Sequence, residues 1–249
     1  MKKRHLFLFT LFVVSLFYFF YPQVNASEQL RLVNHTYTMN RSALPQTLTP
    51  IAPTHFYEVD GHVEADPLII PAFQQMMQRA YEENVTHFIV NSGFRSFQSQ
   101  RNVYKTYGAP RALKPKQSEH HTGLALDIGS TVGLMENTEE GKWLQQNVWD
   151  YGFIMRYPAH KTDVTQIQSE PWHIRYVGLP HSLLMKHYDL VLEEYIAYLH
   201  DAHTVTYGDY TIHTLTKREY QQFLKEHADV TYDASFDGTG FVIVTIHNG

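Results

Sequence analysis

The spacing of apolar residues predicts a series of helices separated by short strands. In residues 66–83, Phe73, Met76, Met77 and Ala80 recur at helical spacing, which places them on one face of a helix. Pro71 stands near the start of this segment, where a helix tolerates proline. The same kind of pattern predicts further helices at residues 96–107, 139–151, 180–199 and 217–226.

Short apolar runs bounded by glycine or polar residues predict strands between these helices. The strands in the first part of the chain are expected at residues 87–90, 124–128, 153–156 and 172–177. After residue 200 the pattern changes, because residues 204–215 alternate like a strand or hairpin and residues 231–246 fit two strands around a Gly-containing turn. The pattern therefore predicts helices and strands in alternation, followed by a β-rich extension over residues 201–249.

The N-terminal residues have the pattern of an export signal. Basic residues 2–4 precede an apolar run at residues 6–21, and residues 24–26 form a small-residue cleavage pattern. The run is shorter than the roughly 20 residues that a membrane-spanning helix needs. We therefore interpret residues 1–26 as a signal peptide, with an uncleaved membrane anchor as the alternative, and expect the rest to be exported. The polar, Pro-containing residues 27–54 are expected to form a linker or a loose wrapping arm.

The composition narrows the possible functions. The 249 residues carry 20 Lys and Arg against 25 Asp and Glu, a formal net charge of −5, whereas a nucleic-acid-binding protein would show a basic patch or stripe. With 0 Cys, the chain has no disulfide, no thiolate metal site and no Cys nucleophile. Its 16 His residues are therefore the soft metal ligands that the sequence offers.

Three short segments contain the residue types that metal-assisted hydrolysis requires. They are residues 92–100, residues 118–127 and residues 170–173. His120, Asp127 and His173 offer two imidazoles and one carboxylate, and zinc hydrolases use three protein ligands of this kind. Asp127 stands in an apolar run, where a carboxylate is costly to bury unless it is paired or bound to a metal. These segments predict a metal site with one open coordination position.

Glu170 is the candidate general base. It lies three residues before His173, but Pro171 and the β-like residues after it argue against a helix, so Glu170 is expected to end a loop and His173 to open a strand. The helical H-E-x-x-H pattern occurs nowhere in the chain. A carboxylate beside a metal site can accept a proton from water and return it to a leaving amine.

Arg95, Gln100 and Ser118 are candidates for contacts with a substrate. Arg95 follows a predicted strand, and its guanidinium fork is suited to stabilise an oxyanion or to bind a substrate carboxylate. Gln100 and Ser118 are neutral hydrogen-bonding groups that can orient a substrate.

Several of these residues also have a simpler interpretation. His121 is adjacent to His120, and on a strand it would point to the opposite face. Asp127 could cap a turn at residues 129–130, and Arg95 could be an ordinary surface cation. Spacing alone leaves both interpretations open.

The three segments together resemble the VanY-type D-alanyl-D-alanine carboxypeptidases. This zinc peptidase group includes D-Ala-D-Ala dipeptidases, L-alanyl-D-glutamate endopeptidases and the Hedgehog signalling domain. The group's patterns are matched in order: S-G-[YF]-R-S with a later Gln by Ser92 to Gln100, S-x-H-x-x-G-x-A-x-D by Ser118 to Asp127, and E-x-W-H by Glu170 to His173. The similarity covers approximately residues 67–199 and leaves out the arm and the extension.

The resemblance implies a fold and a set of site residues. The fold is α+β, a small central antiparallel sheet flanked by helices of the Hedgehog/D-Ala-D-Ala peptidase type, here followed by the β-rich C-terminal appendix. The zinc D,D-carboxypeptidase domain is expected at residues 55–200, with one Zn²⁺ per chain. The implied roles are His120, Asp127 and His173 as zinc ligands, Glu170 as catalytic base and then acid, Arg95 as the substrate and transition-state arginine, and Gln100 and Ser118 as substrate contacts.

The implied activity is removal of the C-terminal D-Ala from peptidoglycan pentapeptide stems, outside the bacterial cell membrane or in the cell wall. A serine-type mechanism is not expected, and glycopeptide resistance is a role that the resemblance permits. The expected partners are stem peptides ending in D-Ala-D-Ala, and the membrane if the leader is retained; neither nucleic acid nor an obligate protein partner is indicated. The alternatives are an L,D-carboxypeptidase or endopeptidase acting on the same stems, and a zinc-stabilised cell-wall binding module without turnover.

Overall fold

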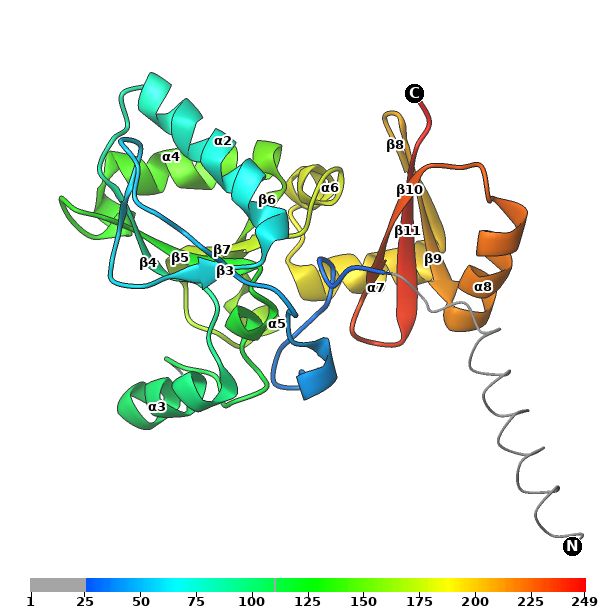
Figure 1. Ribbon diagram of the computed structural model, residues 1–249, viewed down its shortest axis with the longest axis horizontal. Coiled ribbons are helices and arrows are strands. Elements are labelled where there is room, and N and C mark those ends of the chain that lie inside the picture. Colours follow the sequence, from blue (N-terminus) through cyan, green and yellow to red (C-terminus); the bar gives the residue numbers. More distant parts are fainter. Residues whose placement is uncertain (1–25, 110) are drawn as a thin grey trace, which may run out of the picture.

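The structure is a computed structural model that describes residues 26–109 and 111–249 (Figure 1). The predicted leader, residues 1–26, lies outside the described residues except for its last position, so its interpretation stays a prediction. Within the described ranges, no helix is long and apolar enough to cross a membrane.

The first of two main sheets has five strands in the order β2-β4-β5-β7-β6. These are β2 (Glu58–Val59), β4 (Phe88–Ser92), β5 (Ala125–Ser130), β6 (Phe153–Tyr157) and β7 (Glu170–Tyr176). Neighbouring strands are antiparallel except β2 and β4. Asp127 of β5 lies opposite Ser92 of β4 on one side and opposite His173 of β7 on the other. The predicted central antiparallel sheet is confirmed, and its register brings the three segments together.

Helices α2 (Ile70–Glu82) and α4 (Glu139–Asn147) cover one face of this sheet (Figure 1). Successive side chains of a strand point to opposite faces. Leu126 and Ile128 of β5 are therefore buried in the core beneath these helices, whereas Asp127 between them points to the other face. Helices α3 (Phe97–Tyr107) and α5 (Thr162–Thr165) lie on that other side in Figure 1. Alternation thus explains how an apolar strand presents a carboxylate.

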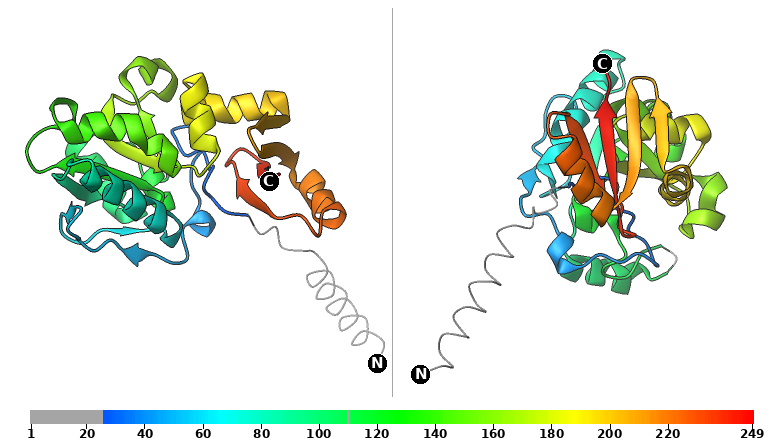
Figure 2. Two further views of the ribbon diagram at one scale, coloured as in Figure 1. Left: turned by 90° about the horizontal axis from the view of Figure 1, so that it is seen from above. Right: turned by 90° about the vertical axis from the view of Figure 1, so that its right-hand side faces the viewer.

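The β-rich appendix predicted after residue 200 is a second, four-stranded antiparallel sheet in the order β10-β11-β9-β8. Ile212 and Ile243 on one of its faces pack against α7, and Val242 and Val244 on the other pack with Tyr220 of α8. Figure 2 shows this unit beside the first sheet and its helices. Its elements are α7 (Leu192–Ala202), β8 (Thr204–Tyr207), β9 (Tyr210–Thr216), α8 (Lys217–Glu226), β10 (Tyr232–Phe236) and β11 (Phe241–His247).

The single helix predicted at residues 180–199 is wrong in one respect, because two helices occupy this stretch. Helix α6 (His181–Tyr188) ends where Asp189 adopts a left-handed conformation with φ of 52°. Helix α7 then begins at Leu192, and the carboxylate of Glu194 accepts a hydrogen bond from the backbone N–H of Val191 at 3.0 Å. The apolar spacing continues across the boundary between α6 and α7 and therefore does not predict it, because the boundary depends on local backbone geometry.

Residues 27–54, the predicted linker or arm, contact the rest of the chain at several places. Leu30 and Leu32 are buried in the apolar cluster formed by β6, α6, α7 and the second sheet. Met39, also buried, donates its backbone N–H to the carbonyl of Lys116 at 2.7 Å. Farther on, β1 (Thr49–Pro50) pairs with β3 (Glu64–Ala65). The arm therefore contacts both the appendix and the segment that leads into residues 118–127.

Candidate active site

The loop between β4 and α3 positions Arg95. Gly93 is required here because a Cβ at this residue would lie 2.3 Å from the backbone oxygen of Glu64. The backbone N–H of Arg95 donates to the carbonyl of His120 at 3.0 Å, and Ser96 caps α3 by accepting from the N–H of Ser99. In the S-G-F-R-S segment, Ser92 therefore ends β4, Gly93 allows close approach to the backbone of Glu64, and Ser96 caps α3.

Residues Glu119–Thr122 form a 3₁₀ turn that leads into β5. Gly123 ends the turn with φ of 72°, a left-handed conformation that favours glycine, and a Cβ there would lie 3.0 Å from the backbone nitrogen of Asp66. Gly123 is therefore needed for the turn and for packing against Asp66.

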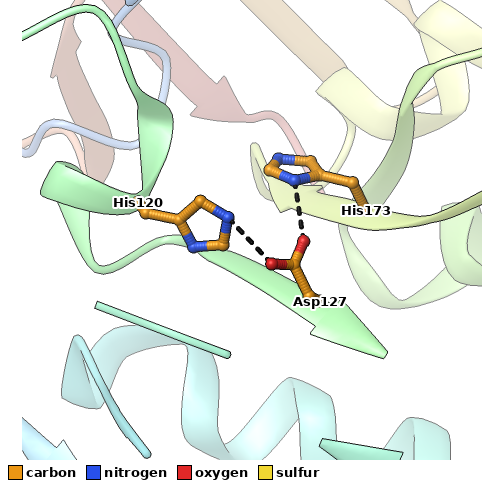
Figure 3. A group of neighbouring side chains, drawn as sticks. All are labelled: His120, Asp127 and His173. Atoms are coloured by element: carbon orange, nitrogen blue, oxygen red, sulfur yellow. Dashed lines mark hydrogen bonds and ion pairs between the residues drawn. The ribbon is translucent and has the colours of Figure 1, made fainter. Parts of the chain in front are cut away.

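His120, Asp127 and His173 meet on the face of the first sheet opposite α2 and α4 (Figure 3). One ligand atom from each residue lies within 4.8 Å of the others. The Nε2 atom of His120 lies 3.2 Å from Oδ2 of Asp127, and the Nδ1 atom of His173 lies 3.0 Å from Oδ1. The second ring nitrogen of His120, Nδ1, donates to the carbonyl of Gly93 at 2.6 Å. Hence Nε2 of His120 and Nδ1 of His173 are the nitrogens that face the carboxylate.

This donor set fits a divalent metal ion. Two nearly buried imidazoles and a carboxylate converge from a 3₁₀ turn and two strands, as in catalytic zinc sites with an open fourth position. Burial alone would lower the pKa of His173, but its hydrogen bond to Asp127 and the nearby carboxylate of Glu119 outweigh burial and raise the pKa to about 9. His120 has its pKa lowered to about 4, by burial and by the nearby Arg95. The surroundings therefore favour positive charge at His173 and disfavour it at His120.

Glu170 lies beside this cluster, with Oε2 at 3.6 Å from Nδ1 of His173. The structure corrects the expected strand boundary, because β7 begins at Glu170 itself and pairs there with Tyr157 of β6. Burial is the main influence on this carboxyl group and raises its pKa to about 7. A carboxyl group with a pKa near neutrality is suited both to accept and to donate a proton.

The guanidinium of Arg95 is held from three sides. Its Nη2 donates to Oδ2 of Asp127 at 2.6 Å, its Nε donates to the hydroxyl of Ser92 at 3.1 Å, and its Nη1 donates to Oε1 of Gln100 at 3.1 Å. Gln100 is buried, and its Nε2 donates to the carbonyl of Leu113 at 2.7 Å. Gln100 thus connects Arg95 to the loop at Leu113, a role that the sequence did not suggest.

A cavity of about 600 Å³ opens over the cluster. All seven residues named for the site in the sequence analysis line it. Ser118 is one of them and lies at the start of the 3₁₀ turn. One wall comes from α3 and the loop after it, and the other from the start of β7 and the segment before it. Their lining residues include Val103, Tyr107, Arg111, Leu113, Ile167 and Trp172. The cavity gives an extended ligand access to His120, Asp127, His173 and Glu170.

His121 is not on a strand, as the sequence analysis assumed, but within the 3₁₀ turn. Its Nδ1–H donates to the carbonyl of Arg95 at 2.5 Å, and its Nε2 accepts from the backbone N–H of Lys116 at 3.1 Å. Both ring nitrogens are therefore engaged away from Asp127. His121 fastens the loop that carries Arg95 to the segment before the 3₁₀ turn.

Several charged residues beneath the site were not predicted from the sequence. Glu119, Arg156 and Arg175 are fully or almost fully buried, and Arg156 bonds to both Glu119 and Glu193. Burial alone would raise the pKa of Glu119, but Arg156 and Arg175 hold it well below its ordinary value. The signal that could have revealed Arg156 and Arg175 is a charged residue within an apolar strand, the argument that singled out Asp127.

Comparison with known proteins identifies the family. The family described as VanY, D-alanyl-D-alanine carboxypeptidase, matches residues 63–179. A solved vancomycin resistance D,D-pentapeptidase VanY, from a VanB-type resistance cassette and in complex with Zn(II), is 30% identical with a TM-score of 0.57. The match covers 68% of this chain and 98% of that one. The chain belongs to the VanY family.

Two further proteins extend the comparison. A D-alanyl-D-alanine carboxypeptidase of Enterococcus faecium is 49% identical over 148 residues, which are 59% of this chain and 49% of the relative. The chain thus spans about half the length of that relative. The solved LdcB LD-carboxypeptidase, whose structure is described as revealing peptidoglycan recognition, is 33% identical with a TM-score of 0.59, covering 67% of this chain and 84% of that one. The family and fold predicted from the sequence are confirmed.

Proposed function

We propose that this protein is a zinc-dependent D,D-carboxypeptidase that removes the C-terminal D-Ala from peptidoglycan pentapeptide stems. The observation that carries the proposal is the convergence of His120, Asp127 and His173 in one cavity, with Glu170 beside them. The carboxypeptidase names of VanY relatives and the Zn(II) complex of a VanY structure support it. A single zinc ion per chain is part of the proposal.

Nε2 of His120, a carboxylate oxygen of Asp127 and Nδ1 of His173 would hold the zinc ion. When bound, zinc supplies Lewis acid chemistry, which polarises a carbonyl and makes a water molecule acidic. The carbonyl of Gly93 fixes the orientation of the His120 ring through Nδ1, so that Nε2 carries no proton and faces Oδ2 of Asp127 at 3.2 Å and Nη2 of Arg95 at 3.0 Å. The chain therefore orients this ligand atom, and Arg95 would give up its contact with Nε2 when a metal is bound.

Glu170 and Arg95 perform the proton transfer and charge stabilisation. Glu170 accepts a proton from the attacking water and then donates it to the departing D-Ala amine, which its pKa of about 7 allows in both directions. Arg95, fixed by Ser92 and Gln100, provides a positive charge where the peptide oxygen becomes negative. Ser118 offers a hydroxyl group from the cavity wall to orient the stem.

Mass spectrometry of a UDP-linked pentapeptide tests the reaction directly. After incubation with zinc-loaded protein, we expect the loss of one alanine and no further shortening. Loss of alanine from a tetrapeptide stem instead would indicate L,D-carboxypeptidase activity, the second candidate, which the similarity to LdcB favours. Release of a fragment cut between L-Ala and D-Glu would contradict both and indicate an endopeptidase.

The pH dependence of the reaction is set by Glu170 on the acid side. Glu170 must be ionised to accept a proton, so kcat/KM is expected to rise as pH rises through the pKa of this group. Burial places that pKa at about 7, and a neighbouring metal cation shifts it downward because it favours the carboxylate. Rates of the zinc-loaded enzyme across pH should show one ascending limb at or below neutrality. A profile that is flat on the acid side would contradict Glu170 as the base.

Penicillin is expected to leave the protein unlabelled. β-Lactams trap serine enzymes as acyl-enzymes, whereas here water is the proposed nucleophile and no acyl-enzyme forms. Intact-mass measurement of the pure, zinc-loaded protein after incubation with a penicillin should show no adduct. A stoichiometric adduct would contradict the metallo-carboxypeptidase mechanism.

We also propose that the protein acts outside the cell membrane. The support is the sequence of basic residues 2–4, the apolar run at residues 6–21 and the small residues that follow. Removal of the terminal D-Ala there would eliminate D-Ala-D-Ala ends from the wall precursors, which is the basis of the proposed contribution to glycopeptide resistance.

A further inference from the structure

The carboxylate of Glu119 lies directly behind His173. Glu119 belongs to the 3₁₀ turn and its side chain is fully buried. One oxygen, Oε1, accepts a hydrogen bond from Nε of Arg156 at 2.8 Å and lies 3.2 Å from Nη1 of Arg175. The other oxygen, Oε2, faces Nε2 of His173 at 3.6 Å. Within the described residues, neither Oε2 nor Nε2 has a hydrogen-bond partner.

The tautomer of His173 explains why Oε2 of Glu119 and Nε2 of His173 face each other. A neutral imidazole has a single N–H, and a nitrogen that coordinates a metal cannot carry it. Nδ1 of His173 is the nitrogen that faces Asp127, at 3.0 Å, so coordination there places the proton on Nε2. A buried N–H needs an acceptor. The oxygen Oε2 of Glu119 is the acceptor that faces it.

The position of Glu119 is fixed by the charged residues around it. Arg156 is fully buried and donates from Nη1 and Nη2 to the two carboxylate oxygens of Glu193 on α7, at 2.8 and 2.7 Å. Arg175 is also fully buried, and its Nη2 donates to two backbone carbonyls of the arm. These contacts leave Glu119 little freedom to rotate. The arm and α7 therefore support the carboxylate that faces His173.

We propose that Glu119 is a positioning residue that keeps the N–H of His173 on Nε2 and directs Nδ1 toward the metal. This inference rests on the proposed metal site of the carboxypeptidase. Carboxylates behind a metal-binding His orient the ring and increase its basicity, and their loss typically lowers metal affinity about 10- to 100-fold. Glu119 is thus expected to act on metal affinity, through His173, rather than on the substrate.

Metal affinity of Glu119→Gln, compared with Glu193→Gln, tests this role. Both substitutions remove a carboxylate bonded to Arg156, but the side chain of Glu193 bonds to Arg156 and Asn34 and not to the His173 ring. Glu193→Gln therefore controls for loss of a carboxylate that neutralises the buried Arg156. Zinc affinity is measured by competition with a chromophoric chelator, and coordination by the absorption spectrum of the cobalt(II) protein. Circular dichroism confirms folding of each variant.

We expect zinc affinity about 10- to 100-fold weaker in Glu119→Gln, with an altered cobalt spectrum, and little change in Glu193→Gln. Wild-type affinity and spectrum in Glu119→Gln would overturn the inference, and so would an equal loss in both variants. Failure of the wild-type protein to bind zinc or cobalt would overturn the proposed metal site as well, which distinguishes the two failures.

A measurement on the unaltered protein covers the case in which Glu119→Gln does not fold. In the zinc-loaded protein labelled with ¹⁵N-histidine, NMR should show His173 with its proton on Nε2 and slow exchange of that proton with water. The signal is assigned by its absence in His173→Asn. A proton on Nδ1 of His173, or rapid exchange at Nε2, would overturn the inference.

Discussion

Glu170→Gln is expected to lower kcat by about 10²- to 10⁴-fold while the zinc content stays at the wild-type level. The amide has nearly the shape of the carboxyl group but cannot accept the proton of the attacking water. Glu170 is not one of the three grouped metal-binding residues, and its Oε2 lies 3.6 Å from Nδ1 of His173, so its replacement removes no ligand. The measurements are initial rates on a pentapeptide stem and zinc per protein.

Glu139→Gln is a suitable control for this experiment. Glu139 is a carboxylate on α4, 75% exposed and bonded to Lys142. Helix α4 lies on the face of the first sheet opposite the metal-binding cluster. It is expected to retain wild-type activity. Unchanged hydrolysis by Glu170→Gln would refute Glu170 as the base. A folded Glu170→Gln variant that has lost its zinc would instead place Glu170 among the ligands.

The grouping of His120, Asp127 and His173 was predictable because a charged carboxylate, Asp127, stands among apolar residues in the sequence. A carboxylate in an apolar strand requires a partner, and two imidazoles in matching motifs supplied candidates. The register of β4, β5 and β7 then places Asp127 between Ser92 and His173. Strand alternation, visible in the sequence, explains why Asp127 leaves the apolar core.

The surroundings of these residues were not predictable in the same way. Glu119 and Arg156 form a buried pair 37 positions apart in the sequence, and no periodicity specifies which charged residues meet across a sheet. His121 was judged by an assumed strand, whereas a 3₁₀ turn directs its ring to the carbonyl of Arg95. Both failures concern tertiary contacts and local backbone geometry rather than residue type.

His120→Ala and His121→Ala are expected to separate metal binding from positioning. Nε2 of His120 faces Asp127, so its loss removes one of three ligand atoms. We expect zinc affinity to fall by more than the about 10- to 100-fold that loss of a supporting contact costs. His121→Ala should retain zinc, because both nitrogens of His121 bond to backbone atoms of Lys116 and Arg95.

The activity of the two variants provides the second distinction. Added zinc should restore activity to the chelator-treated wild-type protein but not to His120→Ala. His121→Ala should keep its zinc and still lose activity, since the ring that holds the Arg95 carbonyl at 2.5 Å is gone. Zinc content and rate are measured on the same samples after a check of folding. Equal zinc loss in both variants would contradict the ligand assignment, because only one of these adjacent rings faces the carboxylate of Asp127.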